Sequence, residues 1–226
     1  MKKIVFSLAA LFVSLAMSAQ EVEPKEAIKG EVSPAVSALR LATDLVKYGY
    51  AQQSALPLID ALQIISENPT QPLGAEKEGE ATEATAQGKK GNVTLKFNDI
   101  LASAKEFADG DERLLALIAV VENDANGAHR GAVNGPKYTE DVVRASSTDN
   151  FRVSFVRGYL AEIALSGDGD TDLDLYVYDS NGNLIASDTD YSDDCYVNWV
   201  PAWTGAYTVK VVNRGGVANR YVLVTN

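Results

Sequence analysis

Cysteine, histidine and tryptophan are scarce in this chain of 226 residues, which has one cysteine, one histidine and two tryptophans. With Cys195 alone, no disulfide can form within the chain, so stability outside the cytoplasm has to come from packing or from a bound metal. A nucleophile–base pair would require Cys195 to meet His129. Cys195 shares a strand face with Val197 and Trp199, which predicts a buried, inert thiol, and His129 lies in a glycine-rich connector. We therefore predict no catalytic residues.

Long apolar runs are equally scarce. The run Ile4–Leu15 follows the basic start Met1–Lys3 and precedes small residues up to Ala19. A basic head, an apolar stretch of about 7–15 residues and a small-residue exit are typical of a secretory signal peptide, here residues 1–20. The alternative is a transmembrane anchor, but a spanning helix needs about 20 apolar residues. The sequence predicts an exported protein, periplasmic or secreted, without a membrane span.

Basic residues are outnumbered by acidic ones. The chain has 20 Lys and Arg against 31 Asp and Glu, which gives a formal net charge of −11. An acidic surface repels nucleic acid and anionic lipid, and it suits cations, basic partners or simple solubility. We predict no nucleic-acid partner.

The first half of the chain shows helical periodicity. Ser33-Pro34 is typical of a helix start, and we expect that helix to stop near Gly49. A second helix follows Ser54, with apolar residues at i, i+3, i+4 and i+7. Two further helices follow near Asn98–Ala108 and after Asp111. The four helices either form a small bundle or present apolar faces to another protein.

Two segments interrupt this pattern. Residues 70–93 are rich in Glu, Ala, Thr, Gly, Gln and Lys and contain no aromatic residue, which predicts a flexible low-complexity linker. Residues 125–137 are glycine-rich and predict a connector. The predicted order is a signal peptide (1–20), a helical hairpin (21–69), a linker (70–93), a second hairpin (94–124), the connector (125–137) and a β domain (138–226).

The last segment reads as strands throughout. Short runs alternate apolar and polar residues between turn signals, and Asn181-Gly182 is a strong hairpin signal between Leu173–Tyr178 and Leu184–Ser187. Such spacing predicts an antiparallel β-sandwich. The whole chain is therefore predicted as α+β, with about four helices followed by a jelly-roll-like sandwich.

Acidic residues are concentrated in two clusters of this β segment. If the two strands around Asn181-Gly182 pair, the clusters meet at one edge of the sandwich. Close carboxylates repel unless a cation lies between them, and hard oxygen ligands favour Ca²⁺. The alternative is that these aspartates only form turns and add soluble charge. The predicted calcium ligands are Asp168, Asp170, Asp172, Asp174, Asp188 and Asp190.

Several of these strands resemble a known family. Asp172–Asp179, Asn181–Asp188 and Thr204–Val209 are similar to strands of the bacterial pre-peptidase C-terminal domain. The resemblance covers roughly Asp149 to Asn226. It implies a jelly-roll-like sandwich of the kind that follows the catalytic domain of secreted proteases, including collagen-binding modules of which some bind calcium. Ser33–Asp124 is too short and too helical for a peptidase, so the resemblance implies a module without its enzyme.

Three function classes follow. We predict an exported, non-catalytic, calcium-stabilised binding module that contacts an extracellular or periplasmic protein or glycan. Its candidate ligand platform is aromatic: Trp203, Tyr191, Tyr176 and Tyr178, with Trp199 placed inside. The alternatives are an assembly protein whose helical half recruits a partner, and a hydrolase accessory or cryptic hydrolase.

Overall fold

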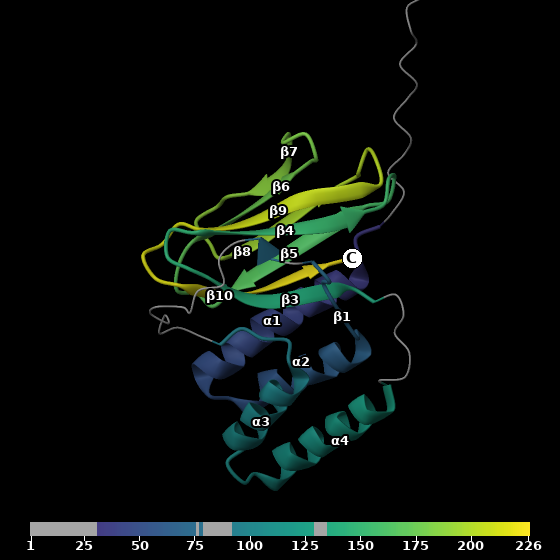
Figure 1. Cartoon of the computed structure of the whole chain (residues 1–226). Coiled ribbons are helices and arrows are strands. Elements are labelled where there is room, and N and C mark those ends of the chain that lie inside the picture. Colours follow the sequence, from purple (N-terminus) through teal and green to yellow (C-terminus); the bar gives the residue numbers. More distant parts are fainter. Residues whose placement is uncertain (1–30, 76, 79–91, 129–134) are drawn as a thin grey trace, which may run out of the picture.

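The chain is described by a computed structural model that places residues 31–75, 77–78, 92–128 and 135–226 (Figure 1). It shows four helices at the N-terminal end followed by two five-stranded sheets packed as a sandwich, which confirms the predicted α+β class. The predicted signal peptide, His129 and residues 79–91 of the predicted linker lie outside the described residues.

The helices are α1 (Pro34–Gln52), α2 (Ala55–Glu67), α3 (Phe97–Phe107) and α4 (Glu112–Ala128). The Ser33 hydroxyl accepts a hydrogen bond from the Val36 N–H at 3.3 Å, as the predicted helix start requires. Helix α1 ends at Gln52, three residues beyond Gly49, near which its stop was predicted, and Gly49 lies inside α1 where α2 crosses closely. A Cβ atom at Gly49 would lie 2.6 Å from Leu58 Cδ2. The glycine therefore serves helix packing rather than helix termination.

The strands form two sheets. The first has the order β1-β3-β10-β5-β8, and the second has the order β2-β4-β9-β6-β7. Pairing is antiparallel except between β1 and β3. The first sheet contains β1 (Gln71–Pro72), β3 (Lys137–Val143), β10 (Asn219–Thr225), β5 (Ala161–Gly167) and β8 (Asp194–Trp199). The second contains β2 (Lys77–Glu78), β4 (Thr148–Phe155), β9 (Gly205–Asn213), β6 (Leu173–Tyr178) and β7 (Leu184–Asp188).

The first residues of the predicted linker and of the predicted connector belong to strands and a helix of the fold. β1 and β2 each add a short edge strand, and Lys77 Nζ lies 2.8 Å from Asp149 Oδ2 and 3.0 Å from Asp141 Oδ1. Helix α4 continues to Ala128, inside the predicted connector, with Ala125 buried. Composition predicted a flexible linker and a connector, whereas the ion pairs of Lys77 and the burial of Ala125 make these ends part of the fold.

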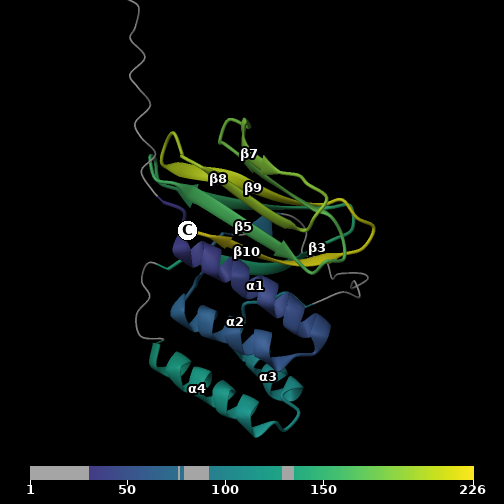
Figure 2. The same ribbon diagram turned by 180° about the vertical axis from the view of Figure 1, so that it is seen from behind.

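The molecule has two hydrophobic cores. One lies between the two sheets and contains Trp199, Tyr207 and Tyr221, so the predicted interior position of Trp199 is confirmed. The other lies between the helices and the outer face of the first sheet, to which Ala164, Val222 and Val224 contribute. We call the first sheet the covered sheet and the second the open sheet. Figures 1 and 2 show all four helices on the far side of the covered sheet, away from the open one.

Polar contacts join α1 to the covered sheet. The Ser166 and Thr43 hydroxyls lie 3.0 Å apart, and Lys47 Nζ lies 2.7 Å from Asp194 Oδ2. The Ser33 N–H donates to the fully buried Glu162 carboxylate at 2.6 Å. Among the described residues, no helix combines the length and the apolar character needed to cross a membrane.

Candidate functional site

The two acidic clusters meet at one edge of the sandwich, as the predicted hairpin requires. β6 pairs with β7, with Leu175 opposite Asp188. The loop from β5 to β6 carries Asp168, Asp170 and Asp172, and the loop from β7 to β8 carries Asp190 and Asp193. We call these five residues the acidic edge.

Backbone donors hold the first part of the acidic edge. Asp168 Oδ2 accepts the Arg220 N–H at 2.9 Å, and Asp168 Oδ1 accepts the Asp170 N–H at 3.2 Å. Asp193 Oδ2 accepts the Gly169 N–H. Asp193 is buried and packs against Gly167, where a Cβ atom would lie 2.4 Å from its Oδ2. The sequence prediction omitted Asp193 from the ligand set, although it lies at the centre of the edge.

Burial and like charge oppose ionisation at two of these carboxyls. The pKa of Asp168 is raised by burial and by the charges of Asp170 and Asp193, against the lowering effect of its backbone donors. The pKa of Asp172 is raised by burial and then by the charge of Asp174. Asp172 Oδ1 is buried with no hydrogen-bond partner among the described residues. Both carboxylates would therefore gain from a nearby cation.

Asp190 of the acidic edge and the two predicted ligands on the flanking strands, Asp174 and Asp188, each accept a hydrogen bond. Asp174 pairs with the Arg214 guanidinium and accepts the Tyr176 hydroxyl at 3.1 Å. Asp188 Oδ2 accepts the Tyr196 N–H at 2.8 Å. Asp190 Oδ1 accepts the Ser192 N–H at 2.8 Å, and its hydrogen bonds to Ser192 lower its pKa. Of the six predicted ligands, four therefore lie in the acidic edge, and Asp174 and Asp188 lie on the flanking strands β6 and β7.

As the side chains lie, no three acidic, histidine or cysteine residues of the described ranges are arranged to hold a metal ion. A protein cation offsets part of the charge instead. Lys47 of α1 lies 3.7 Å from Asp193 Oδ1 and closer to Asp194. The helical layer thereby contacts the acidic edge directly.

Two of the four predicted platform residues come together on the outer face of the open sheet. The rings of Tyr176 and Tyr178 stack, with centroids 6.3 Å apart and planes inclined by 26°. Lys210 Nζ lies 4.8 Å from the centroid of the Tyr178 ring. Arg214 donates to the Tyr176 hydroxyl at 2.9 Å.

The other two platform residues lie elsewhere. Tyr191 is 100% exposed in the loop from β7 to β8. Trp203 is half-buried, whereas Trp199 is buried, and the Trp203 ring stacks on Tyr207 at 5.5 Å with an angle of 13°. The structure therefore shows a tyrosine pair rather than a single four-residue platform.

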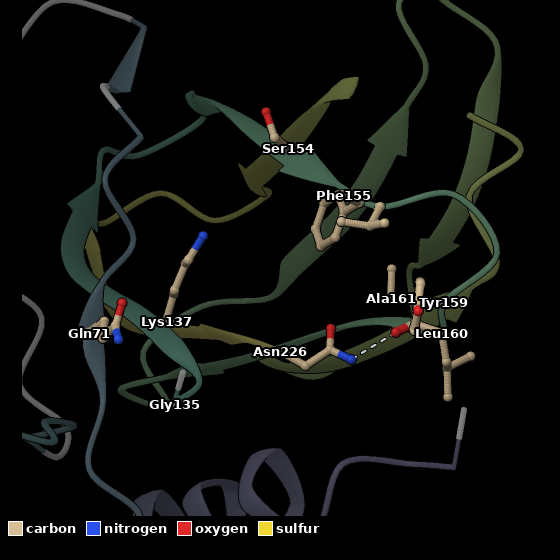
Figure 3. A pocket seen from close by; sticks show the side chains of 10 residues that line it. Gln71, Gly135, Lys137, Ser154, Phe155, Tyr159, Leu160, Ala161 and Asn226 are labelled. Carbon is tan, nitrogen blue, oxygen red and sulfur yellow. Dashed lines mark hydrogen bonds between the residues drawn. The ribbon is translucent and has the colours of Figure 1, made fainter. Parts of the chain in front are cut away.

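A cleft at the end of the sandwich was not predicted. Its volume is about 760 Å³. Figure 3 shows Lys137 pointing into it from β3, facing Phe155 of β4, with Tyr159 and Leu160 opposite and Asn226 on its floor. Asn226 donates to the Leu160 carbonyl at 2.8 Å. Its residues come from distant parts of the chain, so no local sequence pattern marks it.

Cys195 has the predicted properties of an inert thiol. It is buried, its sulfur lies 3.1 Å from the Leu173 carbonyl oxygen, and burial raises its pKa further above the physiological range. The thiolate needed for nucleophilic chemistry is thus disfavoured.

No protein-family model matches the chain. No curated protein is significantly similar to it in sequence either. Some solved structures share weak similarity with part of this chain. The pre-peptidase C-terminal domain of a Bacillus anthracis collagenase is 13% identical, with a TM-score of 0.33 over 40% of this chain and 88% of that one.

Two further structures match at similar levels. The periplasmic inhibitor PliG of g-type lysozyme from Aeromonas hydrophila is 11% identical, with a TM-score of 0.32 over 40% of this chain and 84% of that one. A carbohydrate-binding module of Cellvibrio mixtus lichenase 5A is 10% identical, with a TM-score of 0.26 over 39% of this chain and 86% of that one. At these TM-scores the likeness carries no functional conclusion.

Proposed function

We propose that this chain is an exported, non-catalytic binding module that contacts a glycan or protein with the outer face of its open sheet. The observation that carries the proposal is the stacked pair Tyr176 and Tyr178 on the open sheet, on the face opposite to Leu175 and Val177 of the inner core. Tyrosine combines an apolar ring with a polar hydroxyl, so a surface pair suits ligands that are apolar on one side and hydroxylated on the other.

Calcium belongs to the same proposal as a stabilising ion. The acidic edge would hold it through Asp168, Asp170, Asp172 and Asp190, with Asp193 added from the structure. The buried, unpartnered Asp172 Oδ1 and the raised pKa values of Asp168 and Asp172 support this role. A bound Ca²⁺ would supply positive charge to carboxylates that repel one another; no step of ligand binding passes through it.

The binding proposal is tested on glycan and protein arrays with residues 21–226. The double variant Tyr176→Ala/Tyr178→Ala is expected to lose the signals of the unmodified chain. Tyr159→Ala, which removes a ring from the cleft, is the matched control and is expected to keep them. If Tyr159→Ala loses binding and the double variant keeps it, the binding site lies in the cleft instead. Absence of any array signal would contradict the binding function.

The calcium proposal is tested by calorimetry on the same chain. The isolated β segment is unsuitable because Val222 and Val224 of β10 pack against the helices. Asp170→Ala/Asp172→Ala is expected to abolish the heat of calcium binding and the accompanying rise in melting temperature. Asp60→Ala/Asp124→Ala makes the same charge change on exposed helix positions and is expected to retain both. No heat with the unmodified chain would show that the aspartates only form turns.

One observation favours a second candidate, recruitment of a partner by the helical half. Leu115, Leu117 and Val120 of α4 are 37%, 48% and 57% exposed. An apolar helix face of this kind can dock another protein. Capture of a partner that Leu117→Glu/Val120→Glu abolishes, and that the tyrosine double variant leaves intact, would favour this candidate.

A further inference from the structure

The open sheet carries a regular arrangement of polar side chains around its tyrosine pair. In the strand register, Thr208 of β9 lies opposite both Arg152 of β4 and Tyr178 of β6. Lys210 lies opposite Asn150 and Tyr176 in the same way. Residues opposite one another on one sheet face have Cβ atoms about 4.5–5.5 Å apart, and diagonal neighbours lie about 7–8 Å apart. One continuous surface therefore holds two cations, two aromatic rings and two short polar side chains: Arg152, Lys210, Tyr176, Tyr178, Thr208 and Asn150.

The two cations on this surface have no acidic partner. Among the described residues, neither Arg152 nor Lys210 lies within 4.0 Å of a carboxylate, whereas Lys47, Lys77 and Arg214 are all ion-paired. The carboxylate on the same face, Asp174, is already paired with Arg214. Glu78 lies at the margin of the sheet, opposite Asn150.

The local charge of this surface differs from that of the whole chain, which has a net charge of −11. Lys210 beside the Tyr178 ring and Arg152 on the next strand but one, both without an ion pair, make this surface locally positive. Such a region attracts anionic ligands and repels basic ones.

We propose that the ligand of the open sheet is an anionic glycan that carries uronic-acid carboxylates, with Arg152 and Lys210 binding the carboxylates. This inference rests on the proposed function and adds the charge class of the ligand. Lys210 lies over the Tyr178 ring, so Tyr176 is the neighbouring ring available to a sugar, directly opposite Lys210 in the register. Thr208 and Asn150 add a hydroxyl and an amide group to the same face, both able to form hydrogen bonds with sugar hydroxyls. A guanidinium such as Arg152 binds a carboxylate through two parallel hydrogen bonds.

The test uses calorimetry on residues 21–226 with oligomers of galacturonate, alginate and hyaluronan. The methyl ester of the galacturonate oligomer is the matched neutral ligand, since it keeps the sugar and removes the charge. We expect at least one acidic oligomer to bind, and its affinity to fall as salt rises. If galacturonate binds, its ester should bind at least tenfold more weakly.

Substitutions assign the effect to the two cations. Arg152→Gln and Lys210→Gln are each expected to weaken binding of the acidic oligomer about tenfold, which corresponds to about 1.4 kcal/mol. Arg113→Gln makes the same charge change on α4 and is expected to leave the affinity unchanged.

Three results would overturn the inference. Equal affinity for acid and ester, or binding of neutral glycans only, would remove the charge preference while the binding function stands. Binding of poly-glutamate without binding of any acidic oligomer would make the ligand an acidic peptide. If none of the three acidic oligomers binds, the ligand is not a uronic-acid glycan. The binding function itself would be rejected only if no glycan or protein on the arrays binds.

Discussion

The two sheets of the sandwich differ in how many faces they bury. In the covered sheet, every residue of β5 is buried, as are six of the seven residues of β10. In the open sheet, β4 and β9 alternate between buried and accessible residues along most of their length. A strand buried on one face alternates in sequence, and a strand buried on both faces reads as continuous apolar sequence. The difference shows that the helices are part of the sandwich's own packing rather than a separate unit.

The difference between the two sheets decides which surface is open to a ligand. The covered sheet is occupied on its outer face by α1, which leaves the open sheet as the sandwich surface available to a ligand. The tyrosine pair and the unpaired cations lie on that surface. The helices therefore both stabilise the fold and decide which face can bind.

The largest predicted effect is a difference in stability between charge substitutions on the outer faces of the two sheets. Val222→Asp places a charge between the helices and the covered sheet, where Val222 is 1% exposed. We expect a loss of more than about 4 kcal/mol in the free energy of unfolding, or failure to fold. Ser154→Asp places the same charge on the exposed outer face of β4 and is expected to cost less than about 0.5 kcal/mol. Urea unfolding followed by circular dichroism measures both, and similar losses would contradict the comparison.

An intermediate effect is predicted for the buried hydroxyl pair between α1 and β5. Thr43 donates to the Arg40 carbonyl at 2.6 Å, so Ser166 is the donor in the contact between the two hydroxyls. Thr43→Val leaves the Ser166 hydroxyl without its acceptor and is expected to cost about 1–3 kcal/mol. In a double-mutant cycle, adding Ser166→Ala is expected to recover part of this loss. Strict additivity would show that the contact does not couple helix to sheet.

Much of the fold follows from local sequence. Ser33-Pro34 begins α1, Asp111 begins α4 through its contacts with the Arg113 and Leu114 N–H groups, and Asn181-Gly182 joins β6 to β7. Each of these signals depends on residues within a few positions along the chain. They are sufficient to predict the elements and their order.

The remaining features depend on contacts between distant residues. One local feature of the sequence indicates that the helices dock on the sheet. It is the apolar run Tyr221–Val224, in which consecutive residues are buried on opposite faces. Gly49 acquires its role only where α2 crosses. For the site, local alternation was enough to place Tyr176 and Tyr178 on one face, whereas Asp193 and the cleft required the tertiary structure.

The smallest predicted effect concerns the acidic edge. The folded-state pKa of Asp172 is raised, so its ionised form costs stability at neutral pH, and this cost disappears as pH falls through that pKa. Without calcium, Asp172→Asn is expected to raise the melting temperature by about 1–2 °C at pH 7. The gain should shrink as the pH falls through the raised folded-state pKa of Asp172, because the unmodified carboxyl then becomes protonated in the folded state. A lower melting temperature at pH 7 would contradict the electrostatic account.

The most direct test of the central claim is a two-dimensional NMR titration of ¹⁵N-labelled residues 21–226 with the tightest array ligand. Binding by the open sheet predicts that the largest shift changes fall on Arg152, Tyr176, Tyr178 and Lys210, while β10 and the helices change little. Changes confined to the cleft around Tyr159, or to the exposed face of α4, would contradict the claim.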